Sequence, residues 1–307
     1  MREIDFEVAP RFVFLGDSIV SDWRNPQATT SRAVVQALGD LGFETVYMEP
    51  RRNSATVGLL GQRGSEPVRS FNALWTGVQY RTVDLPARWE LEAWIGQFAA
   101  TSGVIVLLDG MPEMFERGLA EFEQDDVLIL VERPELGGDW GRSVLRRLGE
   151  SDATIGFRPA VLPGSWDVPR SGTVLVAYDD ADLARAVAAT VPDARRIVTG
   201  SADLPDWDYL PEIELPAVYG AAERVLVVDS AERPIAPARV WLPRANGAAA
   251  WGMVQAGEID ESVAVRFDDL ANVWDREAPD LPERLDARWV ARGLVEMWRH
   301  RSIGSEG

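Results

Sequence analysis

The stretch FVFLGDSIVSDWRNPQATTSRAVVQALGDLGFETVYME, residues 12–49, holds a complete strand–helix–strand unit. Its two ends, residues 12–16 and 44–49, are short apolar and β-branched runs, the composition of buried parallel strands. Between them, apolar residues recur at helical spacing from Thr29, and Gly42 follows the last turn. The stretch therefore predicts a βαβ unit whose helix is capped by Thr29 or Thr30.

The same alternation continues along the first half of the chain. Apolar runs at residues 103–110 and 127–132 predict two more buried strands. Helical patterns, ARWELEAWIGQFAATSG after Pro86 and MPEMFERGLAEFEQDD before residue 127, precede them. An open, doubly wound α/β sheet follows from this order.

Residues 158–170, RPAVLPGSWDVPR, interrupt the pattern with three prolines and no apolar period, which is typical of an interdomain connection. The pattern then restarts, with strands predicted at 172–178, 194–200 and 224–230 and helices between them. We therefore predict two Rossmann-like domains facing a cleft, residues 1–160 and 161–307, the second with a closing helix. That helix would bury one face, formed by Leu285, Trp289, Val290, Leu294 and Met297.

Composition excludes several function classes. The formal charge of the 307 residues is −18, from 49 acidic and 31 basic residues, so nucleic acid and anionic lipid are not expected as partners. All 31 basic residues are Arg, and there is no Cys, which excludes Schiff-base lysines, the P-loop lysine and thiolate chemistry. The acidic N-terminus is unlike a signal peptide, and no apolar run is long enough to span a membrane. A cytoplasmic protein without cofactor or metal is expected.

The loop after the first predicted strand is the first candidate site, because open α/β sheets bind ligands at such loops. Its GDS sequence suggests the nucleophile segment of GDSL-type esterases, with Ser18 as nucleophile. Those enzymes need a His three residues after an Asp, whereas the single His, His300, has Met297 at that place. Without a positioned base a serine hydroxyl is a weak nucleophile, so a hydrolase is the third hypothesis.

Residues 21–49 resemble the opening of GT-B glycosyltransferases of the spore-maturation branch, where WGNGHATTYR precedes ALARRGHEVTFLE. The matching residues are Trp23, Asn25, Ala28, Thr29, Thr30, Arg32, Ala37, Leu38, Gly42, Val46 and Glu49. The resemblance implies that a loop over the interdomain cleft carries the residues Gly16, Asp17, Ser18, Trp23, Asn25, Thr29 and Thr30. The loop His of the family falls on Gln27, which cannot take up a proton near neutral pH.

The second half resembles the donor-binding domain of the same family. The resemblance implies donor contacts from Thr199, Gly200, Ser201, Tyr219, Arg239, Leu242 and Gly247. The segment PARVWLPRANGAAAW, from Pro237, aligns with the family pattern PSVRLFEAAACGTPII, so the Glu that holds the donor ribose falls on Leu242. Pro243 is expected to break the helix there.

The leading hypothesis is therefore transfer of a sugar from a nucleotide-diphosphate sugar to a small-molecule or glycan acceptor. The alternative is a catalytically degenerate relative that binds a ligand or a protein partner. Asp206 and Asp208 mimic an Asp-any-Asp metal signature, but 49 acidic residues produce such spacings by chance. We further expect residues 16–30, the segment near 199 and residues 239–247 to face one cleft.

Overall fold

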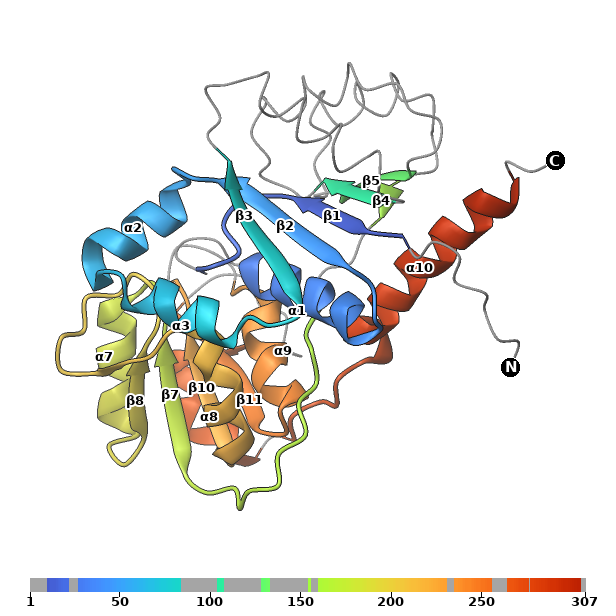
Figure 1. Ribbon diagram of the computed structural model, residues 1–307. Coiled ribbons are helices and arrows are strands. Elements are labelled where there is room, and N and C mark those ends of the chain that lie inside the picture. Colours follow the sequence, from blue (N-terminus) through green and yellow to red (C-terminus); the bar gives the residue numbers. More distant parts are fainter. Residues whose placement is uncertain are drawn as a thin grey trace.

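The computed structural model describes residues 10–21, 27–83, 104–107, 128–132, 154–155, 160–230, 235–255, 264–275 and 277–304. These residues form two parallel sheets, drawn one above the other in Figure 1, with helices α1 and α9 between them. The helices predicted after Pro86 and before residue 127 lie outside the described residues.

The first sheet has the strand order β3-β2-β1-β4-β5-β6, and every neighbouring pair is parallel. The chain starts in the middle of the sheet, adds two strands on one side and then returns to add three on the other, which is the doubly wound order. The strands are β1 (Phe12–Leu15), β2 (Thr45–Pro50), β3 (Val78–Val83), β4 (Val104–Leu107), β5 (Leu128–Glu132) and β6 (Thr154–Ile155).

The second sheet repeats this order as β12-β11-β10-β7-β8-β9, again with parallel neighbours. Two doubly wound sheets in one chain confirm the predicted α/β architecture of two Rossmann-like units. The strands are β7 (Thr173–Ala177), β8 (Arg195–Val198), β9 (Asp208–Tyr209), β10 (Arg224–Val228), β11 (Ala249–Val254) and β12 (Ala264–Arg266).

Helices cover both sheets, and several of them meet between the domains. The described helices of the first domain are α1 (Gln27–Asp40), α2 (Ser54–Arg63) and α3 (Glu66–Leu74). In the second they are α7 (Ala181–Thr190), α8 (Leu215–Ala221), α9 (Pro237–Ala245) and the 3₁₀ segments η1 (Glu212–Glu214), η2 (Phe267–Asp275) and η3 (Glu283–Leu285). Helix α1 contacts α9, and α3 contacts η1, so the two domains touch along these helices.

The start of α1 corrects the predicted cap. The helix begins at Gln27, so Thr29 and Thr30 lie within its first turn and do not precede it. Their hydroxyls accept other donors: Thr29 Oγ1 lies 3.5 Å from Arg32 Nη2, and Thr30 Oγ1 lies 3.5 Å from the Ala160 amide. At the other end the prediction holds, because Gly42 has φ = 88° and follows the last turn.

Helix α9 corrects a second expectation. The helix continues through Pro243 to Ala245. Proline removes one backbone donor and disfavours the preceding turn, and here it stands only two residues before the helix ends. The carbonyls of Leu242 and Pro243 accept from the Asn246 amide, which closes the last turn.

The last helix, α10 (Ala287–Gly304), follows the second domain in sequence but packs on the first. Its buried residues, including Val290 and Leu294, join the core beneath α1. The prediction that Trp289 lies on the buried face is wrong, because its side chain is 53% exposed. The chain thus crosses between the domains twice. The crossings are joined by hydrogen bonds between Val161 and the backbone of Leu285 and Ala287, each 2.9 Å.

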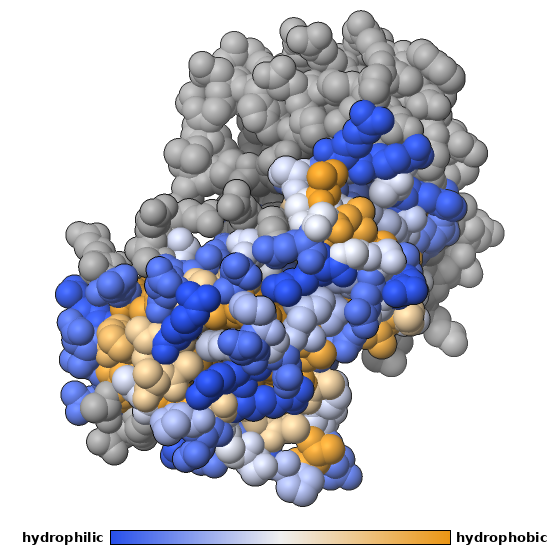
Figure 2. Space-filling view, turned by 90° about the vertical axis from the view of Figure 1, so that its left-hand side faces the viewer, coloured by the Kyte–Doolittle hydropathy of each residue, from blue (hydrophilic) through white to orange (hydrophobic). Residues whose placement is uncertain are grey.

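One side of the described surface is mostly hydrophilic. Figure 2, viewed from the side that carries α2 and α7, shows mostly hydrophilic residues with smaller hydrophobic areas between them. None of the described helices combines the length and hydrophobicity that a membrane span requires.

Candidate functional site

The carboxyl edge of the first sheet is organised around one buried carboxyl group, Glu49, at the end of β2. The side chain is fully buried. Glu49 Oε2 accepts the Ile19 amide at 2.7 Å, and Oε1 accepts Asn53 Nδ2 at 2.9 Å and the Tyr80 hydroxyl at 2.7 Å. The Glu49 cluster (Glu49, Asn53, Thr56 and Tyr80) thereby fixes the loop after β1 to the start of α2.

Burial dominates the electrostatics of this cluster. Removal from water raises the pKa of Glu49 to about 7, although the hydrogen bonds from Tyr80, Ile19 and Asn53 oppose that rise. Burial also raises the pKa of Tyr80, with the neighbouring Glu49 carboxyl adding to it. The pKa of Asp17 in the adjoining loop is raised for the same reason, by burial. Near neutral pH, the carboxyl of Glu49 is therefore poised between its two protonation states.

Ser18 belongs to this edge as a structural hydroxyl. Its side chain is 1% exposed, and Oγ lies 2.9 Å from Thr56 Oγ1. The neighbouring loop backbone is held by the Tyr47 hydroxyl, which donates to the Asp17 carbonyl at 2.9 Å. That Ser18 shapes this turn and is not a nucleophile stays a prediction from the missing Asp/His pair.

The carboxyl edge of the second sheet carries a buried ion cluster at the point where its strand order reverses, between β7 and β10. Arg239 on α9 is 1% exposed and pairs with Asp229, after β10, and with Asp179, after β7, at 3.8 Å. Its guanidinium also lies 3.9 Å from the centroid of the Tyr178 ring. The Arg239 cluster (Arg239, Asp229, Asp179 and Tyr178) thus sets one cation against two carboxylates where α/β sheets receive ligands.

The segment Thr199–Ser201 packs against this cluster. The Thr199 amide donates to the Ala177 carbonyl at 3.0 Å, and Ser201 Oγ donates to Asp179 Oδ1 at 2.6 Å. Gly200 lies so close to β7 that a Cβ there would stand 2.4 Å from the Tyr178 carbonyl oxygen. The segment sits at a strand end, as predicted. The Thr199 amide and the Ser201 hydroxyl have partners within the protein, whereas the buried Thr199 hydroxyl has no hydrogen-bond partner within the part of the chain that the structure describes.

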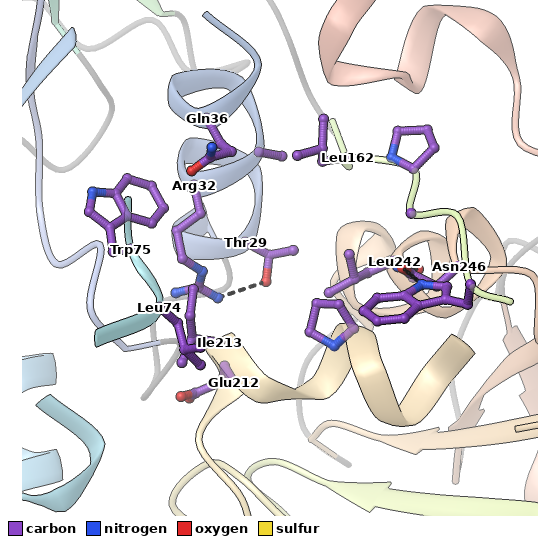
Figure 3. Close-up of a pocket in the computed structure, with 15 residues that line it drawn as sticks. Thr29, Arg32, Gln36, Leu74, Trp75, Leu162, Glu212, Ile213, Leu242 and Asn246 are labelled. Atoms are coloured by element: carbon purple, nitrogen blue, oxygen red, sulfur yellow. Dashed lines mark hydrogen bonds between the residues drawn. The ribbon is translucent and has the colours of Figure 1, made fainter. Parts of the chain in front are cut away.

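A pocket of about 250 Å³ lies between the two domains (Figure 3). We call it the interdomain pocket. Its lining comes from α1 and α3, from the interdomain connection, and from η1, α8 and α9 of the second domain. The lining residues are Thr29, Arg32, Ala33, Gln36, Leu74, Trp75, Leu162, Pro163, Gly164, Trp166, Glu212, Ile213, Pro216, Leu242 and Asn246.

Most of this lining is apolar, and its two ionisable side chains, Arg32 and Glu212, are 8% and 3% exposed. In Figure 3, Leu74 and Trp75 lie on one side, Leu242 and Asn246 on the other, with α1 between them. Arg32 Nη1 donates to the Ile19 carbonyl at 2.8 Å, which ties the pocket to the loop after β1. A concave apolar site with a few polar groups between domains is a common form of small-molecule site.

The structure brings only part of the predicted site together. Thr29 and Leu242, from opposite halves of the sequence, line the interdomain pocket. Gln27 begins α1, Tyr219 is fully buried in the second core, and Arg239 lies in its own cluster. Trp23 and Asn25 are outside the described residues.

The position of Gly247 corrects the prediction that the candidate segments face a single cleft. It lies just before β11, in a second hollow with Glu223 and Arg224 at the start of β10. Thr199 follows the carboxyl end of β8, so the two lie at opposite ends of parallel strands. The reason is that α9 runs back along the sheet, from Arg239 at the carboxyl edge to Gly247 at the amino edge.

Sequence reasoning missed Trp75, Trp166, Glu212 and Asn246 as pocket residues. A usable signal existed for Trp166, because a large aromatic residue in a proline-rich connection has no core of its own to enter. The other three gave no distinguishing pattern. Among the described residues, no group of three His, Cys, Asp or Glu side chains could hold a metal ion. Asp208, of the Asp-any-Asp pair, lies 3.7 Å from Arg195.

No protein-family model and no curated protein sequence matches the chain. Among solved structures it is similar to SsfS6, a glycosyltransferase of Streptomyces sp. SF2575 (13% identity, 94% of this chain and 96% of that one, TM-score 0.47). It is also similar to the spinosyn forosaminyltransferase SpnP (10%, 94% and 95%, 0.49) and to MurG of Acinetobacter baumannii (11%, 94% and 99%, 0.45). These similarities concern the backbone path alone. The fold is assigned from the strand orders of the two sheets.

Proposed function

We propose that this chain is a glycosyltransferase-like protein of the GT-B fold that binds a small molecule in the interdomain pocket and has lost its donor-ribose contact. The observation that carries the proposal is the position of Leu242. It lies on α9, in the wall of a pocket to which both domains contribute. Clefts between domains are preferred positions for ligands, and residue 242 is where the family resemblance calls for a donor-binding carboxylate.

Leucine at this position changes what the pocket binds. Leu242 packs against the core of the second domain and offers no hydrogen-bond acceptor from its side chain. A ribose hydroxyl buried there without a partner costs about 1–3 kcal/mol. At about 1.4 kcal/mol per decade, that loss weakens a nucleotide sugar by roughly tenfold to a hundredfold.

The Arg239 cluster supports the same conclusion from the carboxyl edge of the second sheet. A donor diphosphate needs cations or unengaged amides, and Arg239 is already paired with Asp229 and Asp179. A diphosphate placed beside that cluster would meet two carboxylates and one cation. Repulsion between the phosphates and these two carboxylates would oppose binding.

Transfer of a sugar from a nucleotide-diphosphate sugar to a small-molecule or glycan acceptor is the second candidate. Glu212 is the observation that favours it, because this acidic residue lines the pocket between the domains. A carboxylate can accept the proton of an acceptor hydroxyl, which Gln27 cannot do. In this reading Glu212 takes the place of the His that the family carries in its loop.

Calorimetry on the unmodified protein with uridine, guanosine and thymidine diphosphate sugars separates the two candidates. We expect no sugar-dependent binding, and we expect Leu242→Glu to gain tenfold or more in affinity, because charge-assisted hydrogen bonds contribute about 1.5–3 kcal/mol. Leu60→Glu, on an exposed leucine of α2, is the matched control for added charge. Tight, sugar-dependent binding to the natural protein, with turnover that Glu212→Gln abolishes, would establish transfer instead.

A further inference from the structure

The interdomain pocket contains a large aromatic side chain that is held rigidly yet remains partly exposed. Trp166, on the interdomain connection, is 37% exposed. Its indole Nε1 donates to Asn246 Oδ1 at 2.7 Å, and Asn246 Nδ2 in turn donates to the Leu242 carbonyl at 2.8 Å. Asn246 is itself 1% exposed, so the amide that orients the indole is fixed inside the second domain.

Two glycines make room for that indole. A Cβ at Gly220 would lie 2.2 Å from Trp166 Cγ, and a Cβ at Gly164 would lie 2.5 Å from Trp166 Nε1. Neither contact is possible for a residue with a side chain unless the indole moves. Trp166 therefore lies in a seat that holds its ring in one orientation along the pocket wall.

The opposite wall is also apolar and also partly exposed. Leu74, at the end of α3, is 52% exposed, and Trp75 beside it stacks on Phe71 with ring centroids 5.1 Å apart. Large apolar side chains exposed on both walls of one pocket are costly in water, and a ligand that covers both regains that free energy. The two walls belong to different parts of the fold, the first domain and the connection.

Charge limits the kind of ligand. The ionisable lining side chains are one Arg and one Glu, so their formal charges cancel, while the whole chain carries −18. Arg32 already donates to the Ile19 carbonyl. An anion would gain no unopposed cation from these lining residues and would be repelled by the surrounding surface. The volume, about 250 Å³, is slightly below the usual range for ligand pockets, which favours a small ligand.

We propose that the interdomain pocket binds an uncharged ligand built on an apolar ring system, held between Trp166 and the Leu74–Trp75 wall. This inference rests on the proposed binding function and names the class of ligand. Planar rings gain contact with an indole face through area and through offset or edge-on geometry. Gln36 also lines the pocket; its Nε2 donates to Asp40 at 3.1 Å, and its amide oxygen can accept a hydroxyl of the ligand.

The test uses three probes on the full-length protein: 2-naphthol, its carboxylate analogue 2-naphthoate, and uridine diphosphate glucose. We expect 2-naphthol to bind with a dissociation constant on the order of 0.1–1 mM, as a ligand of this size can. Trp166→Ala should weaken it about tenfold or more, and the matched control Trp289→Ala, an exposed indole on α10, should leave it within about twofold. Leu74→Asp tests the opposite wall and leaves unchanged the residues that hold Trp166, namely Asn246, Gly164 and Gly220. 2-Naphthoate should bind about tenfold or more weaker than 2-naphthol.

Each other outcome overturns the inference. Equal binding of 2-naphthoate, or absence of 2-naphthol binding at millimolar concentration, refutes the uncharged apolar class. If uridine diphosphate glucose binds more tightly and loses affinity in Trp166→Ala, the ligand class is wrong while the binding function of the pocket stands. If probes bind but none responds to Trp166→Ala or Leu74→Asp, the pocket itself is not the site, and the proposed function fails with the inference.

Discussion

Substitution of Glu49 by Gln should change how the stability of this protein depends on pH. Burial raises the pKa of Glu49 from 4.5 to about 7, which corresponds to about 3 kcal/mol of preference for the protonated form in the folded state. Below pH 4.5 the carboxyl is protonated both folded and unfolded, and the stabilisation is fully present. As the pH rises toward 7 the unfolded chain ionises first, so the contribution falls by about 1.4 kcal/mol per pH unit. Above pH 7 it stays constant.

Glu49→Gln removes this titration and adds a constant term. Both carboxyl oxygens of Glu49 now accept hydrogen bonds, so in either orientation the glutamine N–H₂ replaces an acceptor, either for the Ile19 amide or for Asn53 and Tyr80. That mismatch lowers the stability of the variant by about 1–3 kcal/mol at every pH, so it does not itself contribute to the pH dependence of stability. Between pH 5.5 and 8, the natural protein should therefore lose about 2 kcal/mol relative to Glu49→Gln.

Urea denaturation at pH 5.5, 6.5, 7.5 and 8 measures the difference, at pH values that stay above the isoelectric point near 4.5. Glu44→Gln is the matched control, because the Glu44 carboxyl is 44% exposed and pairs with Arg11 at the surface. The control should reproduce the pH dependence of the natural protein. Parallel curves for Glu49→Gln and the natural protein would show that Glu49 does not titrate in this range.

Three further substitutions test other parts of the structure. Ser18→Ala should change no ester hydrolysis, because the natural protein is expected to have none, and aryl-ester turnover that disappears in this variant would contradict the structural role of Ser18. Arg239→Met leaves two buried carboxylates without their cation and should lower stability by about 3–5 kcal/mol in thermal or urea denaturation, with part of the loss recovered by adding Asp229→Asn; an unchanged melting temperature would refute the cluster. Arg63→Ala removes two contacts from α2 to the second domain, to the Ala202 carbonyl at 3.4 Å and to the Tyr209 ring at 4.5 Å. It should lower the stability by about 1 kcal/mol and expand the molecule in small-angle X-ray scattering. An identical scattering profile would exclude a role of Arg63 in holding the domains together.

The central strands were predictable because buried parallel strands are written as continuous apolar runs. Residues 12–15 and 173–177, which begin the two sheets, were both read correctly from such runs. Edge strands lack that signal. Strand β3, VQYRTV, alternates polar and apolar residues, and β9 and β12 are only two and three residues long. These strands were missed, as were β6, β11, α2 and α3, although the order of the other strands sufficed to predict the doubly wound fold.

The candidate site was less predictable, because its residues come together only in the folded chain. Resemblance pointed to Thr29 and Leu242, and both line the interdomain pocket. Nothing in the local sequence indicated that α9 runs from one edge of the sheet to the other, which separates Arg239 from Gly247. Trp289 was assigned to the buried face by periodicity alone. Periodicity gives the spacing of a helical face, while the partner, here α1 of the first domain, decides which residues that face includes.

The connection between the domains links ligand binding to their relative position. Trp166 is carried by this connection and is fastened to the second domain through Asn246, whereas Leu74 and Trp75 belong to the first. The two chain crossings, hydrogen-bonded at Val161, are the covalent joints about which the domains would turn. Any such rotation would move the two walls of the pocket apart, so a ligand in contact with both must bind the closed arrangement more tightly than an open one. Binding in this pocket and closure of the domains would therefore be coupled equilibria, and each would stabilise the other by the same coupling free energy.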